Sequence, residues 1–70
     1  MAHQVIMPLN PDAALSQAGM AKGYALASDE FIVAGHVAQS FRKPGDDSTI
    51  YTAYCPINVW TPIKWIEHAN

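Results

Sequence analysis

Residues 43–55, KPGDDSTIYTAYC, join a turn to the best strand in the sequence. Pro44 and Gly45 are followed by two aspartates and a serine, which are residue types that β-turns favour. Residues 49–55 are then rich in β-branched and aromatic side chains, which predicts a strand. The apolar segment that precedes the turn, residues 31–42, is the natural hairpin partner of this strand.

Residues 31–42 are compatible with either a strand or a helix. Acidic residues at the start and basic residues at the end favour a helix, because they complement the helix dipole. Aromatic and β-branched residues around a central glycine favour a strand; they are Phe31, Ile32, Val33 and Val37, with Gly35. We choose one strand over 31–42, because residues 49–55 then have a partner.

The N-terminal part of the chain carries the signals of a helix start. Asn10 supplies a cap, Pro11 fits the first helical position, and Asp12 suits the positive helix end. Gly19 or Gly23 is expected to end this helix. Three further short segments are expected: a strand at 3–8, an extended segment at 24–27 and a turn at 28–30.

The C-terminal residues after Pro56 have two interpretations. Residues 57–61 alternate as a strand does, and Pro62 ends that strand or places it at a sheet edge. Thr61 and Pro62 also resemble a helix start, so a last helical turn over 63–67 is the alternative.

Together these elements predict an α+β fold, with residues 1–70 forming a single domain. One short N-terminal helix packs on a small, mostly antiparallel sheet of three or four strands. A small open β-barrel is the alternative architecture.

The composition excludes several classes of protein. The chain has 70 residues, 50% hydrophobic and 14% charged, with a formal net charge of −2, which does not fit a disordered protein. Four lysines and arginines make nucleic-acid binding an unfavoured function. No apolar run reaches the length of about 20 residues that spans a membrane. An N-terminus without a signal-peptide pattern, together with one free cysteine, predicts a cytoplasmic location.

Side chains that could carry chemistry do not fall into known patterns. His3, His36 and His68 are far apart in the sequence and form no ligand pair with each other or with Cys55, so we expect no metal and no cofactor. Cys55 is expected to be a buried apolar residue, with a nucleophile beside His36 as the alternative. Asp46 and its acidic neighbour are expected to serve the turn. No phosphate-binding glycine pattern and no serine-hydrolase motif occur, so we expect no enzyme.

Aromatic residues cluster in the C-terminal half of the chain. We expect them to form part of a partner-binding surface with basic residues at its rim, since Trp, Tyr and Arg dominate such surfaces. The members are Tyr51, Tyr54, Trp60 and Trp65, with Arg42 and Lys43 at the rim. The alternative is that the tryptophans fill the core or a subunit contact, because a small domain needs large apolar side chains.

Two functions follow as expectations. The first is a small non-enzymatic interaction protein that binds and blocks or adapts another macromolecule, most directly another protein. The second is a small-molecule-binding homo-oligomer with the ligand between subunits, because one copy is small for a pocket. In its small size and its lack of recognisable motifs, the chain is similar to the compact inhibitors carried by phages and mobile elements. For this reason we place the interaction protein first.

Overall fold

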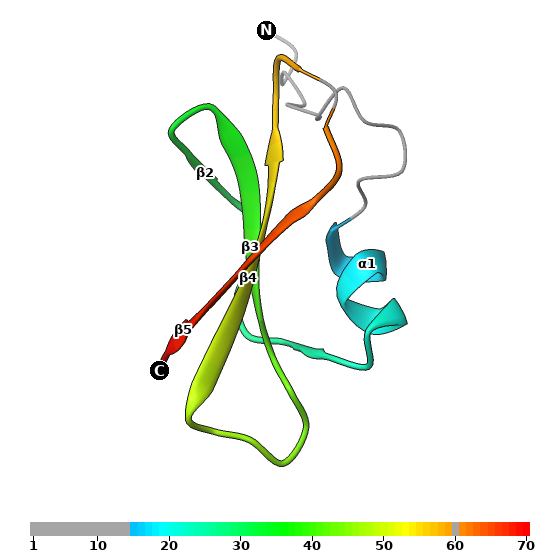
Figure 1. Cartoon of the computed structure of the whole chain (residues 1–70), viewed down its shortest axis with the longest axis vertical. Helices are drawn as coiled ribbons and strands as arrows, with labels where there is room; N and C mark the ends of the chain where they lie inside the picture. Colours follow the sequence, from blue (N-terminus) through cyan, green and yellow to red (C-terminus); the bar gives the residue numbers. More distant parts are fainter. Residues whose placement is uncertain (1–14, 60) are drawn as a thin grey trace, which may run out of the picture.

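The computed structural model describes residues 15–59 and 61–70. One helix, α1 (Leu15–Ala21), lies against one face of a five-stranded antiparallel sheet (Figure 1). The strands are β1 (Ala25–Leu26), β2 (Phe31–Val33), β3 (His36–Arg42), β4 (Thr49–Pro56) and β5 (Lys64–Ala69). The sheet is open, so the predicted α+β fold is confirmed and the barrel alternative is not formed.

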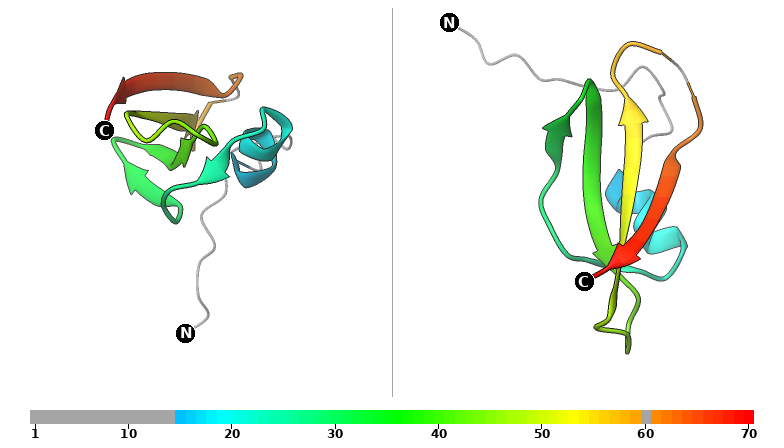
Figure 2. Two further views of the ribbon diagram at one scale, coloured as in Figure 1. Left: turned by 90° about the horizontal axis from the view of Figure 1, so that it is seen from below. Right: turned by 60° about the vertical axis from the view of Figure 1, so that its left-hand side comes forward.

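The two shortest strands share one edge of the sheet. Both β1 and β2 pair with β3, and β4 and β5 follow on the other side of β3. Because β1 and β2 lie one after the other along the same edge of β3, the five described strands form a sheet that is four strands wide. Three or four strands were predicted. Figure 2 shows β2, β3, β4 and β5 side by side, with α1 behind them in the right-hand view.

The loop between β1 and β2 is held to β3 by Ser28. Its hydroxyl oxygen accepts a hydrogen bond from the Ser40 N–H at 3.0 Å, and its carbonyl accepts one from Gln39 Nε2 at 3.1 Å. Three residues, 28–30, thus lie opposite Gln39 alone, and the edge strand is interrupted there.

The prediction of one continuous strand over 31–42 is wrong. The chain reverses at Ala34 and Gly35, so that Val33 pairs with His36. Both turn residues have positive φ, 46° and 73°, as a two-residue type I′ hairpin requires. Alanine rarely adopts this conformation, so the sequence carries only half of the usual signal for such a turn.

The prediction of a strand over 57–61 is also wrong, and so is the helical alternative over 63–67. The described residues of the connection, 57–59 and 61–63, lie outside any strand, and β5 occupies 64–69. Pro56 and Pro62 lack the N–H that a ladder needs and bracket this connection. The six residues of β5 instead pair with residues Thr49 to Tyr54 of β4.

The predicted turn after β3 is confirmed. The Asp46 N–H donates to the Lys43 carbonyl at 3.0 Å, and Gly45 has a φ of 84°. Asp46 Oδ1 accepts from the Ser48 N–H at 2.9 Å and from its hydroxyl at 2.7 Å. The carboxylate therefore serves the turn, as expected.

Gly23 ends the helix, as one of the two expected stop signals. It has a φ of 80°, its N–H donates to the Met20 carbonyl, and the Tyr24 N–H donates to the Gly19 carbonyl, each at 2.9 Å. This is a Schellman motif. The expected strand at 3–8 and helix start at 10–12 lie outside the described residues.

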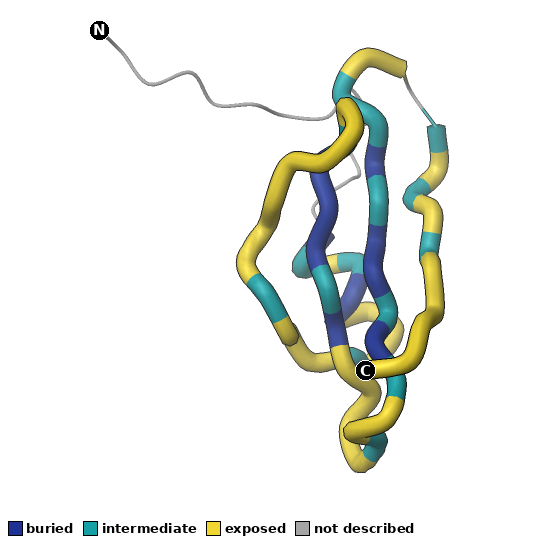
Figure 3. The backbone as a smooth tube through the Cα atoms, turned by 90° about the vertical axis from the view of Figure 1, so that its left-hand side faces the viewer, coloured by how far each residue is buried: buried dark blue, intermediate teal, exposed yellow. Residues whose placement is uncertain are grey.

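The core lies between α1 and the sheet, where buried residues follow β3 and β4 (Figure 3). Its members are Leu15, Val37, Phe41, Ala53 and Cys55, flanked by Tyr24, Ile57, Ile63 and Trp65. Gly19 allows the Phe41 ring to lie against the helix, because an added Cβ would overlap that ring. Within the described residues, no helix has the length and apolarity needed to cross a membrane.

Candidate functional site

The sheet has one face that α1 covers and one that no described element covers. Successive side chains of a strand point to opposite faces, and the core residues Val37, Phe41 and Cys55 place the odd-numbered positions toward α1. We call the other side the open face: the even-numbered residues of β3, β4 and β5, with Phe31 and Val33 of β2. Figure 3 looks onto this face.

Large apolar side chains are exposed on the open face. Phe31, Val33 and Ile66 are 39%, 41% and 38% exposed. They come from β2 and β5, the strands on either side of the sheet centre, and flank the half-buried Tyr54 of β4. The centre of the open face is therefore apolar and exposed to solvent.

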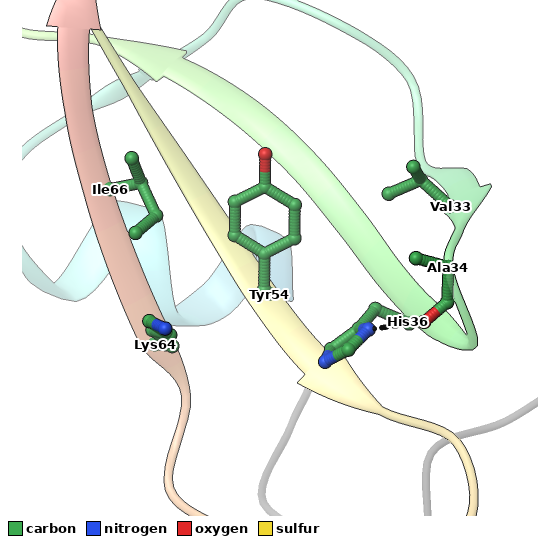
Figure 4. A pocket seen from close by; sticks show the side chains of 6 residues that line it. All are labelled: Val33, Ala34, His36, Tyr54, Lys64 and Ile66. Carbon is green, nitrogen blue, oxygen red and sulfur yellow. Dashed lines mark hydrogen bonds between the residues drawn. The ribbon is translucent and has the colours of Figure 1, made fainter.

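A groove crosses the open face at Tyr54. It has a volume of about 280 Å³ and is lined by Val33, Ala34, His36, Tyr54, Lys64 and Ile66. We call it the Tyr54 groove. In Figure 4 the Tyr54 ring stands in its middle, with Lys64 and Ile66 on one side and the β2–β3 hairpin on the other.

His36 is held in place at one wall of the Tyr54 groove. Its Nδ1 lies 2.8 Å from the Ala34 carbonyl oxygen, which only accepts, so Nδ1 carries the proton and donates. Its ring meets Tyr54 edge-on, with centroids 6.2 Å apart and an interplanar angle of 89°. The type I′ turn that aims the Ala34 carbonyl therefore also orients the imidazole, and Nε2 is left for a ligand or water.

A chain of hydrogen bonds crosses the open face beside the groove. Ser40 Oγ lies 3.0 Å from Thr52 Oγ1, and Thr52 Oγ1 lies 3.1 Å from His68 Nε2. His68 Nδ1 lies 3.2 Å from the Ala69 carbonyl oxygen, which only accepts, so Nδ1 carries a proton and donates. These contacts join β3, β4 and β5 and satisfy the buried Thr52 hydroxyl.

The charges of the open face have one sign. Arg42 and Lys64 are its permanent cations, and His36 and His68 add two imidazoles. No aspartate or glutamate occupies an open-face position of β2, β3, β4 or β5, although the whole chain carries a net charge of −2. Among the described acids, Glu67 lies on the helix side and the others lie in loops.

The structure divides the predicted aromatic surface between the two faces. Tyr51 and Trp65 lie on the helix side, where Tyr24 stacks on Tyr51 at 4.7 Å and meets Trp65 edge-on at 5.6 Å. The Trp65 ring also lies 5.5 Å from the Phe41 ring and 5.0 Å from Lys22 Nζ. Tyr54 belongs to the open face.

The two predicted rim residues follow one another at the end of β3. Arg42 ends β3 on the open face, and Lys43 begins the following turn, with both side chains exposed. Trp60 lies outside the described residues. The structure thus brings Tyr51 and Trp65 together and separates them from Tyr54, and partner contact through these residues stays a prediction.

Cys55 faces the core and not His36. Its side chain is fully buried, and burial raises the pKa of the thiol. His36 lies on the opposite face of the sheet, so the alternative of a cysteine–histidine pair is not formed. In the part of the chain that the structure describes, no three His, Cys, Asp or Glu side chains come together to hold a metal ion.

Sequence reasoning missed most residues of the open face. Phe31, Val33, His36, Lys64 and Ile66 were not among the predicted contact residues, although alternation from residue 64 onward would have placed Lys64 and Ile66 on one side of a strand. The same rule separates Tyr51 from Tyr54, because three residues apart in a strand means opposite faces. No protein-family model, no curated protein and no solved structure matches this chain.

Proposed function

We propose that this chain is a small non-enzymatic interaction protein that binds another protein through the open face and thereby blocks or adapts it. The observation that supports this proposal is the apolar centre of a sheet face that no described element covers. Sheets normally bury such a face against a second layer, and exposed apolar patches with a polar rim mark binding sites. Phe31, Val33 and Ile66 form this centre.

A protein partner would cover a substantial share of the surface of this small chain. A standard interface takes about 800 Å² from each partner, which is about one-sixth of the 4874 Å² surface of this chain. Full burial of a large apolar side chain contributes about 1.5–3 kcal/mol. Each of the three apolar residues is about two-fifths exposed, so covering each one contributes about 1 kcal/mol.

The charges of the face select the kind of partner. A surface with cations at its rim and no carboxylate attracts an acidic protein surface and repels a copy of itself. Two permanent cations, Arg42 and Lys64, are too few to hold a nucleic-acid backbone. The partner is therefore expected to be a different protein with acidic groups around an apolar contact.

A pair of matched variants tests this proposal. Ile66→Glu places a charge in the centre of the open face, and Met20→Glu places the same charge on α1, where Met20 is 63% exposed. The tagged chain is used to isolate its partner from the cells that make it, and the purified pair is then re-formed and its dissociation constant measured. We expect Ile66→Glu to weaken binding about tenfold or more and Met20→Glu to leave it within about twofold.

Thermal unfolding of both variants is the control for folding, since a variant that unfolds loses binding for an unrelated reason. A partner that binds wild type and Ile66→Glu equally would overturn the proposal. So would the absence of any partner that re-forms a complex from purified components.

The Tyr54 groove favours a second candidate, the small-molecule-binding homo-oligomer. The groove is open on one side, so a second copy would supply the missing wall, and an anionic ligand would neutralise the facing Lys64 residues. Native mass spectrometry of the purified chain tests it. An oligomer that carries a few hundred daltons of extra mass supports this candidate, and a bare monomer excludes it.

A further inference from the structure

The outer edge of β5 presents backbone groups that no other described strand pairs. The other edge of the strand pairs with β4 from Thr49 to Tyr54. The Asn70 N–H donates to the Ser48 carbonyl at 3.0 Å, which shows which residues of β5 bond to β4. Because backbone groups alternate between the two edges of a strand, even-numbered residues bond to β4, and Trp65, Glu67 and Ala69 point their N–H and C=O groups outward. Within the described residues no strand lies on that side.

The free edge of β5 is continuous with the open face. Lys64, Ile66 and His68 place their side chains on that face, and Lys64 and Ile66 line the Tyr54 groove. A strand added to this edge would extend the sheet and set its own alternate side chains beside these three residues. It would therefore use the backbone edge and the groove together.

We propose, resting on the proposed function, that the partner protein binds through an extended acidic segment that adds as an antiparallel strand to β5. Its carboxylates lie opposite Lys64 and His68, and an apolar side chain lies opposite Ile66 and reaches the Tyr54 groove. Antiparallel pairing is assigned because every described strand pair is antiparallel and this ladder is the more stable per residue.

A second copy of the chain does not supply such a strand. In the two-fold register centred on Ile66, Lys64 of one copy lies opposite His68 of the other. A cation then meets an imidazole, and the described strands offer no carboxylate on that face, so the pairing gains no charge complementarity. An acidic segment from another protein supplies what this register lacks.

The probe for this proposal is the peptide acetyl-TETVTET-amide, added to the ¹⁵N-labelled full chain and followed by NMR. Centred on Ile66, it places its glutamates opposite Lys64 and His68 and its valine opposite Ile66. We expect saturable shifts of the amide signals of Trp65, Glu67 and Ala69. The peptide acetyl-TKTVTKT-amide has the same backbone with opposite charge, and we expect it to bind about tenfold more weakly or less.

Two further controls test the backbone and the charge separately. In the antiparallel register the third and fifth residues of the peptide donate to β5 and the valine N–H points away. N-methylation of those two threonines is expected to abolish the shifts, and N-methylation of the valine to keep them. Lys64→Glu is expected to reverse the preference between the two peptides.

The outcomes separate this inference from the proposed function. Absence of saturable shifts at millimolar TETVTET, equal binding of both peptides, or insensitivity to threonine N-methylation would overturn strand addition. If Ile66→Glu still weakens the partner complex in that case, the open face remains the interface and only its mode of binding is wrong. If Ile66→Glu leaves the complex intact, the proposed function itself is wrong.

Discussion

Ala34 is the one non-glycine residue with a positive φ in the part of the chain that the structure describes. Its φ of 46° lies in the left-handed region, which costs a residue with a Cβ about 1–2 kcal/mol. The pairing of β2 with β3 offsets this cost. The same turn places His36 at the Tyr54 groove. The strained turn at Ala34 therefore forms one wall of the Tyr54 groove.

Replacement of Ala34 by asparagine is expected to stabilise the protein. Asparagine tolerates left-handed φ and forms type I′ turns with a following glycine, so Ala34→Asn should raise the free energy of unfolding by about 0.5–1 kcal/mol. Urea unfolding measures the change. Ala27→Asn is the control, because Ala27 does not have a positive φ and should show no gain. Equal effects of the two substitutions would contradict this explanation.

Asp46 makes the stability depend on pH in the acid range. The Ser48 hydroxyl, followed by the Ser48 N–H, stabilises the carboxylate, so the pKa of Asp46 lies below its usual value of 3.8. A carboxyl whose pKa is lowered by folding contributes stability above its unfolded pKa and loses it as the pH falls through its folded pKa. The loss is therefore expected below pH 3.8.

Urea midpoints of wild type and Asp46→Asn, measured between about pH 2 and pH 5, test this dependence. Wild type should lose more stability on acidification than Asp46→Asn, and the two curves should converge at the acid end. Parallel curves would show that the Ser48 contacts do not stabilise the ionised carboxylate.

At the scale of elements, β5 is the strand that local sequence patterns did not reveal. Thr61 and Pro62 resemble a helix start, and Trp65 and Ile66 are adjacent apolar residues rather than an alternating pair. β5 forms because β4 offers it six partners and because Trp65 packs on Phe41 in the core. Pairing with β4 and packing on Phe41 both join residues that are far apart in the sequence, so local sequence patterns do not predict them.

Hydrogen exchange tests the register of β5 directly. The amides of Ile66 and His68 face β4 and are expected to be protected, whereas those of Trp65 and Glu67 face the free edge and are expected to exchange about tenfold faster or more. Amide exchange followed by NMR gives each rate. Faster exchange at the even-numbered positions would contradict the pairing on which the free edge depends.

The turn after β3 shows the opposite case, in which local chemistry was sufficient. Pro44 and Gly45 set the backbone, and Asp46 closes the turn, so residues 43–48 were predicted correctly. The Ala34–Gly35 turn was missed because alanine stands where asparagine is usual. The turn at 43–48 was therefore predicted from its own residues. The Ala34–Gly35 turn forms because β2 pairs with β3, and its residues alone do not predict it.

For the whole molecule, the open face predicts a monomer in solution. Two such faces would bring the Arg42 and Lys64 cations of both copies into one contact, where the described strands provide no carboxylate, which opposes self-association. Sedimentation velocity at tens of micromolar should show one monomeric species. A dimer that Ile66→Glu dissociates would make the open face a contact between copies of this chain.

The architecture was easier to predict than the candidate site. A short helix on a small antiparallel sheet follows from turn signals and apolar segments. The site depends on which face each residue occupies, and closeness in the sequence grouped Tyr51, Tyr54 and Trp65 on a single surface that the register divides. The apolar side chains of the open face are exposed because no described element covers it, and local residue patterns do not predict which face of a sheet is covered.

The dissociation constant of the purified partner complex, compared for Ile66→Glu and Met20→Glu, tests the central claim most directly. The two substitutions add the same charge to exposed apolar residues on opposite sides of the sheet. We expect Ile66→Glu to weaken binding by about tenfold or more and Met20→Glu to bind within about twofold of wild type. Equal binding by both folded variants, or weaker binding by Met20→Glu alone, would contradict the claim that the open face is the interface.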